Sequence, residues 1–87
     1  MTEQAQEHLS RLAHELDRRG LRTWLTGGTL RAANPACGLT DSVTCRHDGT
    51  RLAFVWSSGH PIGSVSDLDI AAGRIQYVLR DVAEETS

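Results

Sequence analysis

Residues 42–57 read SVTCRHDGTRLAFVWS and contain the strongest structural signal in the chain. Apolar and polar residues alternate on both sides of Asp48-Gly49, a dipeptide typical of a two-residue β-hairpin turn. A slip of one residue would move the apolar set into water, so the sheet face of each residue is strongly specified. The expected core-facing residues are Val43, Cys45, Leu52, Phe54 and Trp56. The expected cross-strand pairs are Val43 with Phe54, Cys45 with Leu52, His47 with Thr50 and Arg46 with Arg51.

The residues before this hairpin predict a helix and another hairpin. Residues 3–19 repeat apolar side chains at helical spacing, and Gly20 supplies the stop. From Leu21 the period changes to two, and Gly27-Gly28 suits a tight turn with positive φ at both positions. The expected helix stripe is Ala5, Leu9, Leu12 and Leu16. The expected strand pairs are Leu25 with Leu30, Thr23 with Ala32, Trp24 with Arg31 and Arg22 with Ala33.

Two loops and a second helix complete the chain. Residues 34–38 (NPACG) and 58–63 (SGHPIG) are rich in breakers and predict loops. Ser64 or Ser66 is expected to cap the last helix, and residues 83–87 are expected to fray. The expected core stripe of that helix is Leu68, Ala71, Ala72, Ile75, Val78 (or Leu79) and Val82.

The predicted order is therefore α-β-β-β-β-α in one domain spanning residues 1–87. Because no βαβ unit occurs, the sheet is expected to be antiparallel. We expect an α+β fold with a four-stranded antiparallel sheet and both helices on its apolar face. The other face would be open to solvent or to a partner.

Composition narrows the function. The net charge is −2 and all nine basic residues are arginine, so no global attraction to nucleic acid or membrane is expected. No apolar run approaches transmembrane length, and the start of the chain lacks a basic region followed by an apolar run. These features predict a cytoplasmic protein in which Cys37 and Cys45 are reduced.

Catalytic, cofactor and metal motifs are not found. The four histidines lack the i, i+4 spacing of a helical metal site, and two cysteines eight residues apart are poor zinc ligands. Gly27-Gly28 lacks the Gly-Lys-Ser/Thr of a phosphate loop. A nucleophile and base formed by Cys37 and His60 remains a remote alternative, since both are expected in loops. We therefore predict no catalytic residue, no cofactor and no metal.

One surface with functional potential is the open sheet face. Four of the nine arginines share this face with one aromatic side chain, a combination found in binders of single-stranded nucleic acid and equally suited to an acidic helix. Arg46 opposite Arg51 would be unfavourable without an anion between them. The alternative is that the arginine stems cover the sheet while their heads stay in water, with Trp24 over Arg31 as a local cation–π contact. The predicted residues are Arg22, Trp24, Arg31, Arg46 and Arg51.

The other surface is the outer side of the last helix. Ile70, Gly73 and Tyr77 fall together there, opposite the core stripe. A mid-helix glycine costs about 1 kcal/mol relative to alanine, and close approach of another backbone would explain it. Arg74, Arg80 and Asp81 would form a polar rim. This surface predicts a homodimer or a contact with a regulatory protein, and the alternative is an ordinary helix surface with scattered apolar residues.

Short motifs resemble a family of small uncharacterised actinobacterial proteins. They are residues 30–35 (LRAANP), 43–45 (VTC) and 54–57 (FVWS), followed by Gly59 and Pro61-Ile62. The family's aromatic strand is of the type FWWSWGEPI, from which this chain departs at Val55, Ser58 and His60. The resemblance implies an accessory partner of helix-turn-helix regulators and no catalytic residue.

The combined prediction is a small protein-interaction or regulatory accessory module that is not an enzyme. A binder of single-stranded nucleic acid or of an anionic ligand is the alternative. A double-stranded-RNA-binding domain is excluded because its last helix needs a basic start, whereas Ser66-Asp67-Leu68-Asp69 would repel phosphate.

Overall fold

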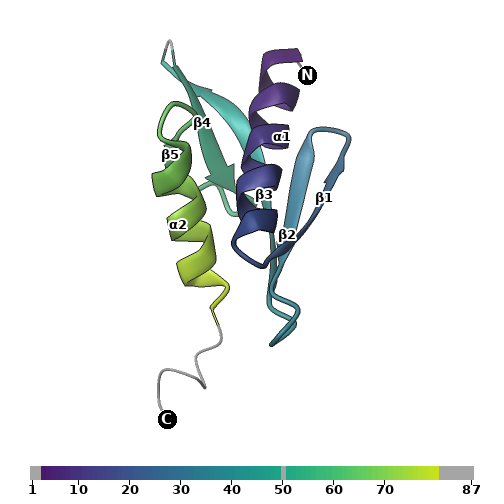
Figure 1. The fold of residues 1–87 in the computed structure, drawn as a ribbon. Helices are drawn as coiled ribbons and strands as arrows, with labels where there is room; N and C mark the ends of the chain where they lie inside the picture. Colours follow the sequence, from purple (N-terminus) through teal and green to yellow (C-terminus); the bar gives the residue numbers. More distant parts are fainter. Residues whose placement is uncertain (1–2, 50, 81–87) are drawn as a thin grey trace.

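Five antiparallel strands stand in chain order, and two helices lie together on one side of them (Figure 1). The computed structural model describes residues 3–49 and 51–80. The α+β class and the antiparallel sheet are confirmed, but the sheet has five strands where four were predicted. The elements are α1 (Glu3–Arg18), β1 (Arg22–Thr26), β2 (Thr29–Ala33), β3 (Thr40–Asp48), β4 (Arg51–Trp56), β5 (Pro61–Ser64) and α2 (Leu68–Val78).

Helix α1 buries the predicted stripe and ends where glycine allows it. Gly20 has φ +88°. Its N–H donates to the Asp17 carbonyl at 3.1 Å, and the Leu21 N–H donates to the Leu16 carbonyl at 3.1 Å. These two bonds form the Schellman cap, in which glycine relieves the steric cost of the left-handed position. Leu16 and Leu21 are both in the core, so the cap turns the chain directly into β1.

The β1–β2 hairpin has the predicted register. Leu25 pairs with Leu30 and Trp24 pairs with Arg31. Gly27 and Gly28 have φ +55° and +86°, as the tight turn requires.

The predicted register of the β3–β4 hairpin is wrong by two residues. Asp48 pairs with Arg51, so Gly49, with φ +67°, is the first of the two residues between the paired positions. This arrangement puts Gly49 at the turn position with positive φ and keeps Asp48 in the strand, and no non-glycine residue in the described ranges has positive φ. It also places an acid, rather than Arg46, opposite Arg51. The observed pairs are Val43 with Trp56, Cys45 with Phe54, Arg46 with Ala53 and His47 with Leu52.

Strand β5 consists of the last three residues of the predicted loop and of Ser64, which was predicted as a possible helix cap. It pairs with β4 through a register shift at Phe54/Val55, and its Ile62 is fully buried. Pro61 is tolerated because it is the first residue of an edge strand. The strand is short and contains proline and glycine, so the alternation of apolar and polar residues did not predict it.

Helix α2 begins at an N-cap other than those predicted. The N-cap is Asp67, without a side-chain capping bond, while the Ser64 and Ser66 hydroxyls lie 2.9 Å apart and pair with each other. Leu79 is buried in the core and Val78 is 49% exposed. Of the two residues predicted for this core position, Val78 or Leu79, Leu79 is therefore confirmed. Val82 and the tail 83–87 lie outside the described residues.

The core fills the space between the two helices and one face of the sheet. Its strand residues include Leu30, Val43 and Phe54, all fully buried. Cys45 and Trp56 are partly buried against it. Leu52 is only half-buried, which corrects its predicted core position. Within the described ranges, neither helix is both long and apolar enough to cross a membrane.

Candidate interaction surfaces

The open side of the sheet carries all five residues predicted for it. Register and alternation connect them, since Trp24 pairs with Arg31, Arg31 pairs with Ser42, and Ser42 shares its side of β3 with Arg46. Trp24 is 51% exposed. The two-residue error in the β3–β4 register left these assignments intact because an even shift keeps every side chain on its own face. The exposed arginines are Arg22, Arg31, Arg46 and Arg51.

Two pairwise predictions for this face are wrong. Arg46 lies opposite Ala53 and not Arg51, so the expected like-charge pair does not form and gives no reason for an anion there. Trp24 and Arg31 make no cation–π contact. The cation–π contact in the described part of the chain is between Arg80 and Tyr77. The Arg80 guanidinium carbon lies 3.6 Å from the centre of the Tyr77 ring.

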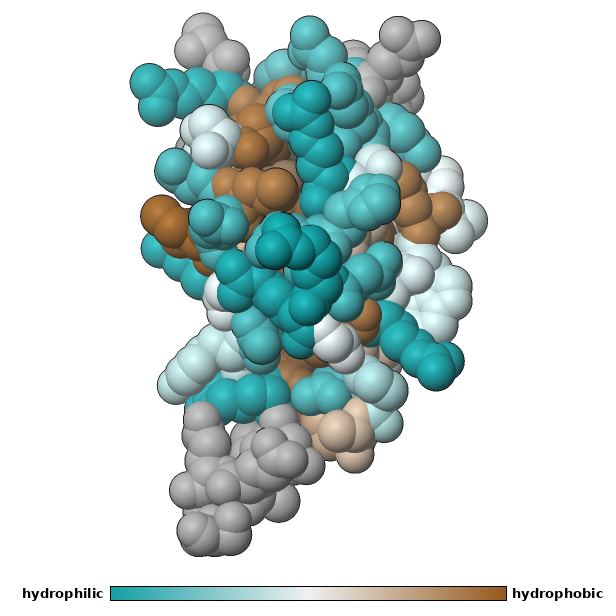
Figure 2. All heavy atoms as spheres, viewed as in Figure 1, coloured by the Kyte–Doolittle hydropathy of each residue, from teal (hydrophilic) through white to brown (hydrophobic). Residues whose placement is uncertain are grey.

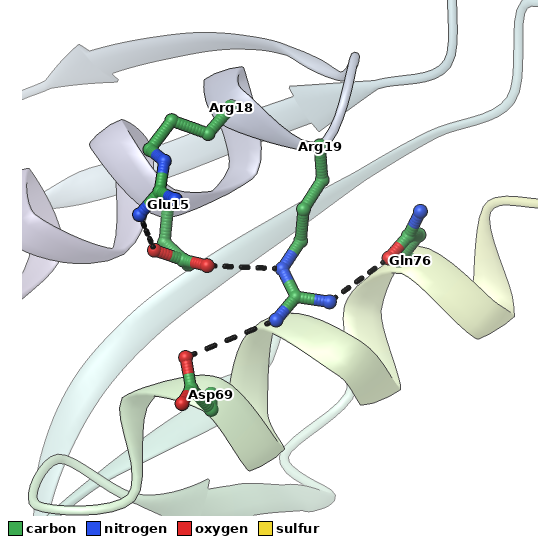
Figure 3. Close-up of polar contacts among 5 residues, drawn as sticks. All are labelled: Glu15, Arg18, Arg19, Asp69 and Gln76. Atoms are coloured by element: carbon green, nitrogen blue, oxygen red, sulfur yellow. Dashed lines mark hydrogen bonds and ion pairs between the residues drawn. The ribbon is translucent and has the colours of Figure 1, made fainter.

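Whether an arginine has a partner within the protein depends on the side of the molecule on which it lies. Each described arginine outside the open face has a partner within the protein. The partners are Glu7 for Arg11, Glu15 for Arg18, Glu15, Gln76 and Asp69 for Arg19 (Figure 3), the Ile62 carbonyl for Arg74, and the ring and carbonyl of Tyr77 for Arg80. The side chains of the four open-face arginines form no hydrogen bond or ion pair within residues 3–47, 49 and 51–80.

Charge follows the same division. The strand positions of the open face hold four arginines and one acid, Asp48. The rest of the chain holds five arginines and ten acids. A net charge of −2 therefore conceals a basic sheet face on an otherwise acidic chain. Figure 2 shows the helical side, where hydrophilic side chains cover most of the surface and hydrophobic ones show between them.

Two shallow hollows mark the open side, and each is bordered by an arginine. One, of about 410 Å³, is lined by Trp24, Thr26, Arg31 and Thr40. The other, of about 300 Å³, is lined by Arg46, His47, Ala53, Val55, Gly59 and Pro61. Both combine a guanidinium with apolar surface, which suits a carboxylate on an aliphatic stem.

The sequence interpretation missed several residues of these hollows. Thr26 shares the side of β1 that carries Trp24, so its position was available from parity. Thr40 was not assigned to a strand, and its place opposite Ala33 depends on how β3 pairs with β2. Pro61 reaches the second hollow only because β5 pairs with β4.

The outer side of α2 exposes two of its predicted residues strongly. Ile70 is 53% exposed and Tyr77 is 62% exposed, with the half-buried Gly73 between them. Arg74, which was predicted for the rim, is exposed, and its guanidinium hydrogen-bonds to the Ile62 carbonyl of β5. Asp81, the other predicted rim residue, lies outside the described residues.

Cys37 and His60, the remote catalytic alternative, lie in different loops and have different partners. Burial raises the pKa of the Cys45 thiol, which disfavours the thiolate that a nucleophile requires. Cys37 contacts the Leu79 carbonyl at 3.7 Å, whereas His60 Nδ1 pairs with the Ser58 hydroxyl at 3.0 Å in another loop. No hydrogen bond joins Cys37 to His60. Within the described ranges, no three His, Cys, Asp or Glu residues are grouped to hold a metal ion.

A scan against protein-family models and searches of curated proteins and of solved structures find no match for this chain. The resemblance to the actinobacterial accessory family therefore stays a prediction that depends on the quoted motifs.

Proposed function

We propose that this chain is a protein-interaction module, not an enzyme, and that its open sheet face binds an acidic segment of a partner protein. The observation that carries the proposal is the division of the arginines. The four on this face are unpaired within the described residues, while the other five are engaged. An acidic partner could therefore be bound without breaking an internal ion pair.

The chemistry of the face fits carboxylates. A guanidinium presents a planar fork that matches a carboxylate with two parallel hydrogen bonds. Arg31 and Arg46 border separate hollows, and the Thr26 and Thr40 hydroxyls add hydrogen-bonding groups to the first. Arg31 pairs with Ser42, which is four residues from Arg46 on β3, so the two arginines stand roughly 14 Å apart on the sheet. A short acidic segment can span that distance.

Charge and aromatic content favour a protein over a nucleic acid. Single-stranded nucleic acids are held by several stacking aromatics together with a continuous basic groove. The open face has one exposed aromatic, Trp24, and the remainder of the chain is acidic and would repel a long polyanion. A short acidic segment meets only the local field of the basic face.

A regulatory protein is the partner class that we propose to examine first. The motifs of residues 30–35 and 54–57 resemble those of accessory partners of helix-turn-helix regulators. Arginine faces suit such a role because electrostatic complementarity gives specificity and fast association more than raw affinity.

Fluorescence anisotropy with two labelled probes tests the proposal. One probe is a synthetic glutamate-rich peptide and the other is a single-stranded oligothymidylate of equal length. The peptide should bind more tightly at low salt, and binding should weaken as salt rises because the contacts are exposed. Arg31→Gln and Arg46→Gln should each weaken peptide binding by about three- to tenfold.

Arg11→Gln is the matched control, since it removes the same charge from the helical side. Arg11 is paired with Glu7 at 2.9 Å and is not on the open face. An equal loss of peptide binding in this variant would mean that net charge alone attracts the probe. No peptide binding at low salt, or tighter binding of the oligonucleotide, would also overturn the proposal.

A further inference from the structure

The described part of the chain ends beside one end of the open sheet face. Helix α2 ends at Val78, and the carbonyl of Leu79 accepts a hydrogen bond from Asn34 Nδ2 at 2.8 Å. Asn34 follows Ala33, the last residue of β2, and Ala33 pairs with Arg22 on β1. Figure 1 shows the end of α2 and the β2–β3 loop at the same end of the molecule. The chain that follows Leu79 therefore starts near the strand ends that carry Arg22.

The segment that follows is acidic. Residues 81–87 read DVAEETS and contain three acids and no base. They lie outside the described residues. Carboxylates on a short acidic segment are the chemistry that a guanidinium fork matches. The chain therefore contains, directly after α2, a segment of the same chemical class as the partner proposed for the open sheet face.

Distance decides which arginines this segment reaches. Glu84 and Glu85 are five and six residues beyond the carbonyl that Asn34 binds, so an extended chain carries them about 17–21 Å from it. Arg22 and Arg31 are about 15 Å from that carbonyl along the sheet, because one lies opposite the last residue of β2 and the other lies two residues before it. Arg46 lies roughly 14 Å farther along β3, beyond the reach of both glutamates.

The two arginines within reach have no partner in the described fold. The exposed side chains of Arg22 and Arg31 form no hydrogen bond or ion pair within residues 3–47, 49 and 51–80. Arg31 also borders the hollow of about 410 Å³ that contains Trp24. On the helical side, Arg19 and Arg80 lie near the end of α2 and already have partners. Charge complementarity therefore favours the open sheet face for carboxylates that follow α2.

We propose that residues 81–87 pass around the end of the sheet and occupy the open sheet face as an internal competitor of the acidic partner. The two glutamates of the segment pair with Arg22 and Arg31. This inference rests on the proposed function, since the partner uses the same face. A covalently attached segment acts at an effective concentration in the millimolar range, and exposed ion pairs are individually weak, so the internal contact is reversible. The hollow of about 300 Å³ beside Arg46 stays open.

Arginine side-chain NMR tests the internal contact without an external ligand. The double variant Glu84→Gln with Glu85→Gln is compared with the wild-type chain, both labelled with nitrogen-15. The Nε–H signals of Arg22 and Arg31 should shift at low salt because their guanidinium groups lose the carboxylates, and the signal of Arg46 should not move. The difference between the two proteins should shrink at high salt, where exposed pairs are screened.

Glu7→Gln with Asp67→Asn is the matched control variant. It removes the same charge at two exposed positions, one in the first half of α1 and one before α2, away from residues 81–87. The signals of Arg22 and Arg31 should stay in place in this variant. Unchanged signals in the double variant, shifts confined to Arg80, or equal shifts in the control variant would overturn the proposal.

Peptide binding measures the competition. The double variant should bind the labelled glutamate-rich peptide about three- to fivefold more tightly than the wild type at low salt, and the control variant should gain less than about twofold. Adding Arg31→Gln should reduce the gain of the double variant below about twofold, whereas adding Arg46→Gln should preserve it, because the segment reaches Arg31 and not Arg46. An equal gain in the control variant, or a full gain with Arg31→Gln, would overturn the competition.

The two measurements separate this inference from the proposed function. Shifted signals of Arg22 and Arg31 without any peptide binding would support the internal contact and overturn the proposed function. Peptide binding without these shifts would leave the open sheet face as a partner site and would overturn the internal competitor.

Discussion

The Asn34 side chain donates a hydrogen bond from Nδ2 to the carbonyl of Leu79 at 2.8 Å, across 45 residues of chain. Its Oδ1 accepts a bond from the Ala36 N–H at 2.9 Å in its own loop. One side chain therefore organises the β2–β3 loop and satisfies a carbonyl at the end of α2. The loop predicted from Asn34-Pro35 therefore connects the sheet to the end of the last helix through a side-chain hydrogen bond.

Replacing Asn34 should cost stability. Asn34→Ala removes both side-chain bonds and leaves the Leu79 carbonyl without its principal donor, so the free energy of unfolding should fall by about 1–2 kcal/mol. Asn34→Asp keeps the local acceptor but loses the donor, and it should also be destabilised. Urea unfolding measures both. Thr40→Ala, which removes a 3.3 Å bond to Gly38 in the same loop, should change stability by less than about 0.5 kcal/mol. Wild-type stability for Asn34→Asp would contradict the role of the bond to Leu79.

Two glycines should respond to the same substitution with opposite signs. Gly20→Ala forces a side chain into φ +88° and should lower the free energy of unfolding by about 1 kcal/mol. Gly73→Ala meets open space in a helix and should raise it by about 0.5–1 kcal/mol. Thermal or urea unfolding measures both variants. A loss of stability in Gly73→Ala would show that the position is constrained within the monomer.

The sequence predicted most of the fold because alternation and helical spacing are local signals. Parity alone placed Arg46 and Arg51 on the open face, even though the β3–β4 register was two residues off. The position of a two-residue turn depends on which residues have positive φ. Asp48-Gly49 is compatible both with a turn formed by these two residues and with the observed turn that begins at Gly49, so the sequence alone does not decide between the two registers. Strand β5 depends on pairing with β4, which a proline and a bulge conceal.

The same local signals identified the residues of the predicted surfaces. They did not predict which of the arginines form hydrogen bonds or ion pairs within the protein. Arg74 and Arg80 look equivalent as charges near Tyr77 in the sequence. In the structure Arg74 turns to the Ile62 carbonyl of β5, and Arg80 stacks on Tyr77. Which arginines remain unpaired is a property of the folded molecule, since it depends on contacts between distant segments.

Arg19 should contribute measurably to the docking of α2 on α1. Its guanidinium bonds Glu15 at 3.2 Å and Gln76 at 3.1 Å and lies 3.9 Å from Asp69, with the side chain only 29% exposed (Figure 3). Arg19→Met keeps the aliphatic stem and should lower the free energy of unfolding by about 1 kcal/mol, less at high salt. Arg11→Met breaks a pair whose side chains are 63% and 61% exposed, and it should cost less than about 0.5 kcal/mol. Equal effects in urea unfolding would mean that Arg19 does not couple the helices.

Cys45 should make the fold sensitive to alkaline pH. Burial raises the pKa of its thiol above the ordinary value of 9.0, so the folded state resists forming a thiolate that the unfolded state forms freely. Stability from this group is complete below pH 9.0 and declines as pH rises through and above that value. Cys45→Ala should flatten that decline in urea unfolding measured across alkaline pH, whatever its effect at neutral pH.

A thiol reagent should label the exposed Cys37 first and Cys45 slowly in the native protein. In Cys37→Ser only the slow reaction should remain, and it should become fast in urea. Fast labelling of Cys45 in the folded protein would contradict its burial against the core.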